Sequence, residues 1–379
     1  MMKTRRVLTA GDRLASPSLF LLPFLCALCA SVANSAFADE VLRPRVVIVS
    51  QFEPGADEGD RPGEFQFWVE REKLSRVIPL PVAFHDVRAN ADGTVIGIVT
   101  GGGTARAAAT VMALGCDPRF DLTKSYWLIN GIAGVDPADA SLGSAAWAEW
   151  VVDGDLAHEI DPREMPKDWT TGFVPLDQSV PYGKPKKAEG DYFNMVYHLN
   201  GGLREWAYQL TKDTPLESFS DDKVKKLRER YVDHPNARRP AFVLKGDEIS
   251  ASTFWHGALL DRWANDWVSY WTDGQANYVM TAMEDSGSLQ SLKFLAKAGR
   301  VDWNRIMVLR TASNYDSPPP GMTAAESLAV ENAGSLSAYL PSLEAAHAVG
   351  SPVVHELVNH WSDYESTPPS KTPVTSGQQ

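Results

Sequence analysis

The sequence predicts an α/β fold in which a parallel or mixed β-sheet is covered by helices on both faces. Short runs of apolar, β-branched residues alternate with longer stretches of helical spacing, and no composition break divides the body of the chain. Hydrophobic residues make up 44% and charged residues 22% of the 379 residues, which is enough apolar material for a sizeable core. We therefore expect a single domain over residues 39–364. A Ser/Thr/Pro-rich tail over residues 365–379 is expected to be disordered.

Six short apolar runs are the expected strands. Several of them end in glycine or polar residues, which is typical of buried strands that lead into loops. The runs cover residues 45–50, 95–100, 126–129, 146–153, 241–245 and 305–310.

Seven stretches have the spacing or composition of helices. They cover residues 105–114, 203–211, 221–231, 255–271, 285–298, 341–349 and 353–361. In one of them Trp263, Trp267 and Trp271 recur every four residues, which predicts the buried face of an amphipathic helix rather than a ligand-binding cluster. Residues 154–200 are rich in proline and glycine without a clear period, so we expect a long excursion from the sheet there.

The N-terminus has the pattern of a secretory signal peptide. Four basic residues precede an apolar stretch over residues 19–32, and Ala36-Phe37-Ala38 supplies the small residues that signal peptidase requires. A membrane anchor is the alternative, but Pro23 interrupts the apolar stretch, which is shorter than a spanning helix needs. We expect residues 1–38 to be removed, a periplasmic or secreted protein, and no membrane span in the mature chain.

The mature chain is acidic. Removing four basic residues and one acidic residue with the leader takes the formal net charge from -12 to -15, which argues against nucleic acid as a partner. Of the three cysteines only Cys116 remains after cleavage, so no internal disulfide is expected.

Three motifs at strand ends are candidates for ligand binding. The first is the loop Gly102-Gly103-Thr104, although tight packing of strand on helix explains its glycines equally well. The second is Met283-Glu284, where an acid that complements the helix dipole is the alternative. The third is the polar run from Arg310 to Asp316, where an N-cap by Ser313 or Asn314 is the alternative.

No metal site or cofactor is expected. His355 and His360 resemble a zinc motif, but they are five residues apart and therefore do not share one helical face. The loop at Gly102 does not match the spacing of a dinucleotide-binding or P-loop motif.

Several longer strings resemble the purine nucleoside permease family of fungi and bacteria, over nearly the whole mature chain. These strings cover residues 129–135, 163–172, 244–247, 253–257 and 310–315. More distantly, the chain is similar to the nucleoside phosphorylase and nucleosidase superfamily. That resemblance implies a three-layer α/β sandwich with a central twisted mixed sheet, a purine nucleoside as ligand and the option of a homo-oligomer.

The superfamily resemblance also implies roles for residues in two of the motifs. Glu284 corresponds to the carboxylate that holds the ribose hydroxyls, and Met283 packs beneath the sugar ring. Asn314 corresponds to the residue that contacts the purine; its amide donates a hydrogen bond but no proton, and Asp316 is an alternative proton source.

Further roles follow from the same resemblance. The loop that starts at Asp247 corresponds to the base-stacking loop, with Phe254 or Trp255 as the aromatic residue. Glu53 corresponds to the carboxylate that activates water, with Asp57 and Glu58 as alternatives in register.

The second glycine-rich loop, at Asn130 and Gly131, lacks the Arg and Ser that hold phosphate in hexameric phosphorylases. Phosphate binding would then depend on Arg61 or Arg106. We therefore expect hydrolysis of purine nucleosides rather than phosphorolysis. The alternative is a nucleoside-binding component of transport without chemistry, as the family name implies.

Overall fold

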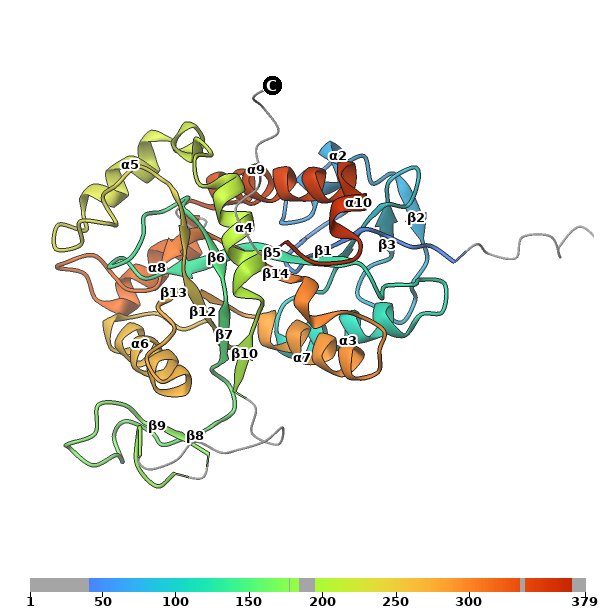
Figure 1. Ribbon diagram of the computed structural model, residues 1–379. Helices are drawn as coiled ribbons and strands as arrows, with labels where there is room; N and C mark the ends of the chain where they lie inside the picture. Colours follow the sequence, from blue (N-terminus) through green and yellow to red (C-terminus); the bar gives the residue numbers. More distant parts are fainter. Residues whose placement is uncertain (1–40, 177, 184–194, 335–337, 370–379) are drawn as a thin grey trace, which may run out of the picture. The chain divides into compact units, whose positions relative to one another are not determined.

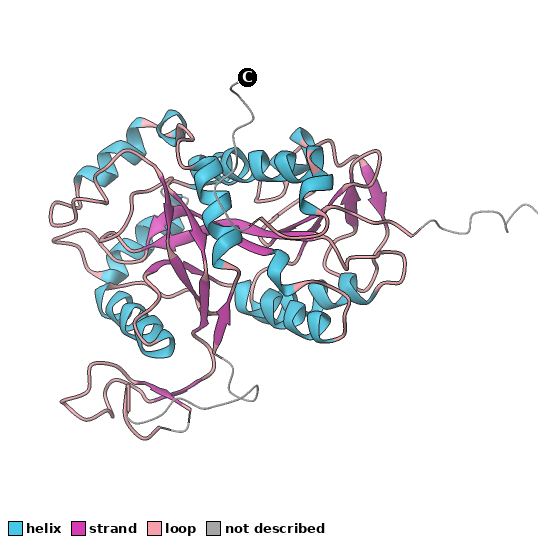
Figure 2. Ribbon diagram, viewed as in Figure 1, coloured by secondary structure: helices cyan, strands magenta, loops and turns pink. Residues whose placement is uncertain are grey.

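The computed structural model describes residues 41–369, apart from residues 177, 184–194 and 335–337 (Figure 1). The signal peptide expected over residues 1–38 and most of the expected tail lie outside these ranges. Strands occupy the centre and helices lie on either side of them (Figure 2). This arrangement confirms the α/β fold class predicted from the sequence.

A mixed sheet forms the central layer. Its strands are β1 (Val46–Ser50), β2 (Arg76–Ile78), β3 (Val87–Ala89), β4 (Val95–Val99), β5 (Tyr126–Val135), β6 (Ala145–Ala148), β7 (Trp150–Asp153), β10 (Val196–His198), β11 (Val243–Lys245), β12 (Asp247–Ser250), β13 (Tyr278–Ala282) and β14 (Ile306–Tyr315). Within the described ranges the order is β10-β7-β12-β13-β5-β1-β4-β3-β2, with β14, β6 and β11 branching from β5. Inside the predicted excursion, β8 (Ala157–Glu159) and β9 (Phe173–Pro175) form a separate two-stranded sheet.

Helices and short 3-10 turns connect the strands. They are α2 (Gln66–Arg71), α3 (Thr104–Cys116), α4 (Gly201–Thr211), η2 (Leu216–Phe219), α5 (Asp222–Glu229), α6 (Ala258–Thr272), α7 (Asp285–Lys297), η3 (Trp303–Arg305), α8 (Ala324–Gly334), α9 (Tyr339–Asn359) and α10 (Trp361–Tyr364). The three tryptophans at spacing four are buried along α6, as the sequence predicts.

Alternate residues of β1 pack in two different hydrophobic cores, one on each face of the sheet. Val46 and Ile48 pack in the core that α4 and α9 cover. Val47 and Val49 point to the opposite face and pack in the core that α3 and α7 cover. A strand buried on both faces reads as a continuous apolar run, because successive side chains alternate between the faces.

The C-terminal helix departs from the sequence prediction. The two helices expected on either side of Pro352 are one helix, α9, with Pro352 inside it. A proline in a helix interior removes one backbone hydrogen bond and costs about 3 kcal/mol. The cost is tolerated because Val349, Val353 and Leu357 are fully buried on both sides of the proline. Burial of the helix face outweighs the local preference of proline.

Strand β14 is longer than predicted, and its extension reaches the candidate motif at residues 310–316. It pairs in parallel with β5 up to Tyr315, so Ser313 and Asn314 lie in a strand and cap no helix. The register shifts between Ala312 and Asn314, which marks a β-bulge. Bulges often redirect side chains beside functional sites.

Candidate functional site

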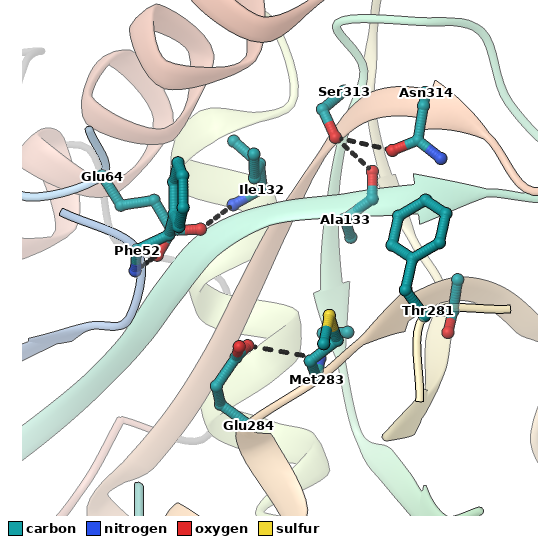
Figure 3. A pocket seen from close by; sticks show the side chains of 12 residues that line it. Phe52, Glu64, Ile132, Ala133, Thr281, Met283, Glu284, Ser313 and Asn314 are labelled. Atoms are coloured by element: carbon teal, nitrogen blue, oxygen red, sulfur yellow. Dashed lines mark hydrogen bonds between the residues drawn. The ribbon is translucent and has the colours of Figure 1, made fainter. Parts of the chain in front are cut away.

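A cavity of about 290 Å³ lies where several segments converge (Figure 3). These segments are the loop after β1, the ends of β5 and β14, the loop after β12 and the junction of β13 with α7. Of the residues singled out from the sequence, Phe254, Met283, Glu284 and Asn314 line the cavity together. Three of the four come from motifs at strand ends, where open α/β sheets place ligands.

Glu284 supplies a carboxylate at the junction of β13 and α7. One oxygen accepts a hydrogen bond from the Gly103 N–H at 3.3 Å, and the other accepts one from the Met283 N–H at 3.2 Å. The residue is 7% exposed. Burial raises the pKa of Glu284 to about 7; the charge of Arg310 opposes this rise, and the charge of Glu64 adds to it. This carboxylate is therefore poised to gain or lose a proton near neutral pH.

Asn314 lies across the cavity from Glu284, in the bulge of β14 (Figure 3). The Ser313 hydroxyl is 3.0 Å from the Ala133 carbonyl and 2.9 Å from Asn314 Oδ1, and its single proton is shared between these two acceptors. Asn314 Nδ2 donates to the Tyr315 carbonyl at 3.2 Å. These contacts orient the amide, and the second hydrogen on Nδ2 can serve a ligand.

Glu64 is a cavity carboxylate that the sequence reasoning missed. One of its oxygens accepts the Gln51 and Phe52 N–H groups, both at 2.8 Å. The other accepts the Ile132 N–H at 2.8 Å, which ties the loop after β1 to β5. Burial raises the pKa of Glu64, whereas the charge of Arg310 lowers it. The loop holds five acidic residues between positions 53 and 64, and sequence alone does not show which one faces inward.

Arg310 lies between the two cavity carboxylates and pairs with a third. Its Nε and Nη2 both bind Asp285, and Nη1 donates to the Ile132 carbonyl at 3.1 Å. Its Nη2 is 3.5 Å from Glu284 Oε2. Arg310 is 1% exposed and does not line the cavity. Its buried positive charge attracts the carboxylates around it.

Gly131 makes this arrangement possible. A Cβ at this position would lie 2.5 Å from both Arg310 Nη1 and Glu64 Oε1. Its neighbour Asn130 faces the core, where its Oδ1 accepts a hydrogen bond from Trp68 Nε1 at 2.8 Å. Asn130 therefore anchors α2 to the sheet, and neither residue lines the cavity.

Glu53 lies outside the cavity lining and closes its own loop. Its carboxylate accepts the N–H groups of Gly63, Phe65 and Gln66 at 2.8–2.9 Å. Burial raises the pKa of Glu53, and these three hydrogen bonds oppose the rise. Glu53 and Glu64 thus each accept three backbone N–H groups, but Glu53 does not line the cavity.

Asp316 is also outside the lining. It is fully buried and accepts a hydrogen bond from the Tyr278 hydroxyl. Burial and the charges of Asp261 and Asp136 raise its pKa well above the usual range. Its contacts point to the core rather than to the cavity beside Asn314.

The residues expected around the base separate in the structure. Asp247 accepts the N–H groups of Glu149, Trp150 and Asn277 at 2.9–3.0 Å, so it joins strand ends and does not face the cavity. Trp255 packs edge-on against Trp263, with ring centroids 5.9 Å apart, in the core under α6. Phe254 is 44% exposed and lines the cavity.

The glycine-rich loop before α3 supports the cavity from one side. Gly103 has φ +90°, a conformation that favours glycine, and this turn aims its N–H at Glu284. A Cβ on Gly102 would lie 3.8 Å from Glu284 Oε1. Thr104 turns away, and its hydroxyl bonds Ser252 at 2.7 Å beside a second hollow.

The two arginines considered for an anion are absent from the cavity lining. Arg61 lies over the Tyr339 ring at 5.1 Å, and Arg106 donates to the Gly102 carbonyl at 3.0 Å from an exposed position. In the part of the chain that the structure describes, no lysine, arginine or histidine lines the cavity. The lining charges are those of two carboxyl groups.

The histidines of the zinc-like string, which we did not expect to bind metal, have carboxylate partners. His355 and His347, both on α9, each place Nε2 within 2.9 Å of the Glu72 carboxylate. His360 instead faces Glu356 on its own helix. Among the described residues, no helix is long and apolar enough to cross a membrane.

Solved structures with resemblance to this chain include two bacterial enzymes. Futalosine hydrolase of Helicobacter pylori is 14% identical, with a TM-score of 0.47 over 84% of this chain and 99% of the other. A 5'-methylthioadenosine/S-adenosylhomocysteine nucleosidase from Neisseria meningitidis is 13% identical, with a TM-score of 0.46 over 83% of this chain and 100% of the other.

Sequence comparison identifies the family. A purine nucleoside permease of Candida albicans is 31% identical over 330 residues, which cover 86% of this chain and 78% of the relative. The family model described as purine nucleoside permease matches residues 43–369, a range that includes every segment of the cavity. The chain therefore belongs to the purine nucleoside permease family.

Proposed function

We propose that the cavity binds a purine nucleoside and positions it for hydrolysis of its N-glycosidic bond. The observation that carries this proposal is the convergence of two carboxyl groups, Glu64 and Glu284, and one amide, Asn314, on a single cavity. The names of the relatives, purine nucleoside permeases, support the ligand class.

The ligand would be held at both ends. Glu284 accepts hydrogen bonds from the 2′- and 3′-hydroxyls of the ribose, and an ionised acceptor makes these bonds strong. Met283 packs beneath the sugar. At the other end Asn314 Nδ2 donates to N7 of the purine, and Phe254 packs against the base. Glu284 and Asn314 lie on opposite sides of one cavity, so we place the ribose and the base of a single nucleoside at its two ends.

Glu64 takes the role first assigned to Glu53. It positions a water molecule and accepts its proton as the oxygen attacks C1′ of the ribose. The bond from C1′ to N9 breaks, the purine leaves with the electron pair and takes a proton from solvent, and free ribose is formed. Phosphate is disfavoured as the attacking group because two carboxyl groups and no cation face the cavity among its described lining residues.

A non-catalytic nucleoside-binding protein is the second candidate. One observation favours it: Asn314 cannot give a proton to the departing purine, and Asp316, the nearest acid in sequence, has its hydrogen bond with Tyr278 in the core. Binding without cleavage would then serve transport, as the names of the relatives suggest.

A chromatographic assay separates these candidates. Purified protein is incubated with inosine or adenosine, with and without phosphate, and free base, ribose and ribose 1-phosphate are measured. Free base and ribose at a rate indifferent to phosphate support hydrolysis. Calorimetric binding of inosine without release of base supports the binding protein, and phosphate-dependent release of ribose 1-phosphate would contradict both.

We also propose that the protein acts outside the cytoplasm, after removal of residues 1–38. The pattern of basic residues, apolar stretch and Ala36-Phe37-Ala38 supports this. Mass spectrometry of the protein from an osmotic-shock fraction should give a mature N-terminus at Asp39. Intact leader in washed membranes would refute the proposal.

A further inference from the structure

We propose that Glu248 carries a proton and is a positioning residue. In its neutral form it holds the ion pair of Asp285 and Arg310 in place, so that the Glu284 carboxylate stays free to bind the ribose. The part of this inference that concerns the ribose rests on the proposed function. The protonation of Glu248 does not.

Glu248 is a buried carboxyl group without a donor. It lies in β12 between β7 and β13, and it is 1% exposed. Neither of its oxygens receives a hydrogen bond from a described N–H or O–H group. The carboxyl group of Asp285 is close enough for its charge to raise the pKa of Glu248. An ionised carboxylate only accepts, so two carboxyl groups can bond each other only when one holds a proton.

The contacts of Asp285 place that proton on Glu248. Both oxygens of Asp285 accept hydrogen bonds from Arg310, a two-point pairing that requires an ionised carboxylate. Glu248 is left as the partner that donates. Its O–H would then donate to Asp285 and help to hold the pair with Arg310 in place.

The charge balance of the cluster leads to the same conclusion. One guanidinium, that of Arg310, faces four carboxyl groups, each at most 7% exposed: Glu64, Glu248, Glu284 and Asp285. Four buried negative charges around one positive charge are too costly, so protons must be retained.

Ionisation of Glu248 would disturb the site. Burial and the charge of Asp285 raise the pKa of Glu248, while Arg310 lowers it and Glu284 raises it further. If Glu248 lost its proton, it would repel Asp285 and compete for the guanidinium. Arg310 would then shift relative to Glu284, 3.5 Å away. We therefore expect nucleoside affinity to fall once the pH is high enough for Glu248 to lose its proton.

The first test needs no ligand. A carboxyl group whose pKa is raised on folding stabilises the protein at acidic pH, and this stability is lost as pH rises above the value of 4.5 for the unfolded chain. The unfolding constant of the wild type relative to Glu248→Gln should therefore increase by up to tenfold per pH unit above that value. Glu159→Gln, an exposed change on β8, is the matched control and should follow the wild-type curve. A ratio that is constant or decreases with pH would show that Glu248 is ionised and overturn the proposal.

The second test concerns positioning. Glu248→Ala should weaken inosine binding at least fivefold at pH 7, and Glu248→Gln, whose amide also donates to Asp285, should restore it to within twofold. At alkaline pH, Glu248→Gln should bind inosine more tightly than the wild type, because it has no proton to lose. Unchanged inosine binding by Glu248→Ala would overturn the positioning role. If the wild type binds no nucleoside, the proposed function fails, whereas the unfolding experiment still decides where the proton lies.

Discussion

Replacement of Glu284 by glutamine tests the ribose contact directly. Glutamine keeps the size of the side chain and one acceptor oxygen but removes the charge. A hydrogen bond to a charged group contributes about 1.5–3 kcal/mol, so Glu284→Gln should weaken inosine binding about 10- to 150-fold. Hypoxanthine has no ribose, and its affinity should change by less than twofold.

The pKa of Glu284 sharpens this prediction. With a pKa of about 7, the binding-competent carboxylate is about one tenth of the molecules at pH 6, half at pH 7 and nine tenths at pH 8. Wild-type affinity for inosine should therefore increase about fivefold from pH 6 to pH 7 and about twofold more by pH 8. Calorimetry at these three pH values is the assay. The reasoning is refuted if Glu284→Gln keeps the wild-type pH dependence, or if hypoxanthine shows the same dependence as inosine.

Three further predictions concern the surroundings of the cavity. Glu64→Gln should reduce any release of free base at least a hundredfold while inosine still binds, whereas Glu53→Gln should mainly lower the melting temperature; equal effects on release would remove Glu64 from its role. Gly131→Ala should destabilise the protein by about 1–3 kcal/mol because its Cβ meets two charged side chains at 2.5 Å; Gly102→Ala, whose Cβ would make only an ordinary contact at 3.8 Å, is the control in thermal unfolding. Burial raises the pKa of Glu72, but hydrogen bonds from two histidines outweigh burial and lower it. The loss of unfolding free energy in Glu72→Gln should therefore be largest above pH 4.5 and disappear as the pH falls below 4.5. A difference in stability between wild type and variant that persists in acid would contradict this.

The fold class and most of the strands and helices could be predicted from the sequence. Each predicted apolar run contains strand residues, because a strand buried on both faces must be apolar at successive positions, but the run over residues 146–153 is two strands, β6 and β7. The helix break at Pro352 was mispredicted because burial of α9 against the sheet is not visible in local sequence. The length of β14 was missed because Ser313 and Asn314 are polar in a strand, and only the bulge and the cavity explain them.

The site residues that could be predicted from the sequence are the polar ones that follow the end of a strand. Glu284 and Asn314 fit this rule, and both line the cavity. The loop after β1 offered no such rule, since its acidic residues differ in role only through the way the loop folds back. Both Glu53 and Glu64 accept N–H groups near the loop, but only Glu64 also accepts one from β5, that of Ile132, and only Glu64 lines the cavity.

The pairing of β5 with β14 has a consequence for how the cavity opens. The two strands pair at nine positions, from Ile306 to Tyr315 of β14, and both are almost entirely buried. Amides along such a pair exchange with solvent only when the whole domain unfolds, whereas exposed loop amides, such as those around Phe254, exchange through local opening. The floor of the cavity should therefore persist as long as the fold does, and any local motion of the cavity is confined to its rim.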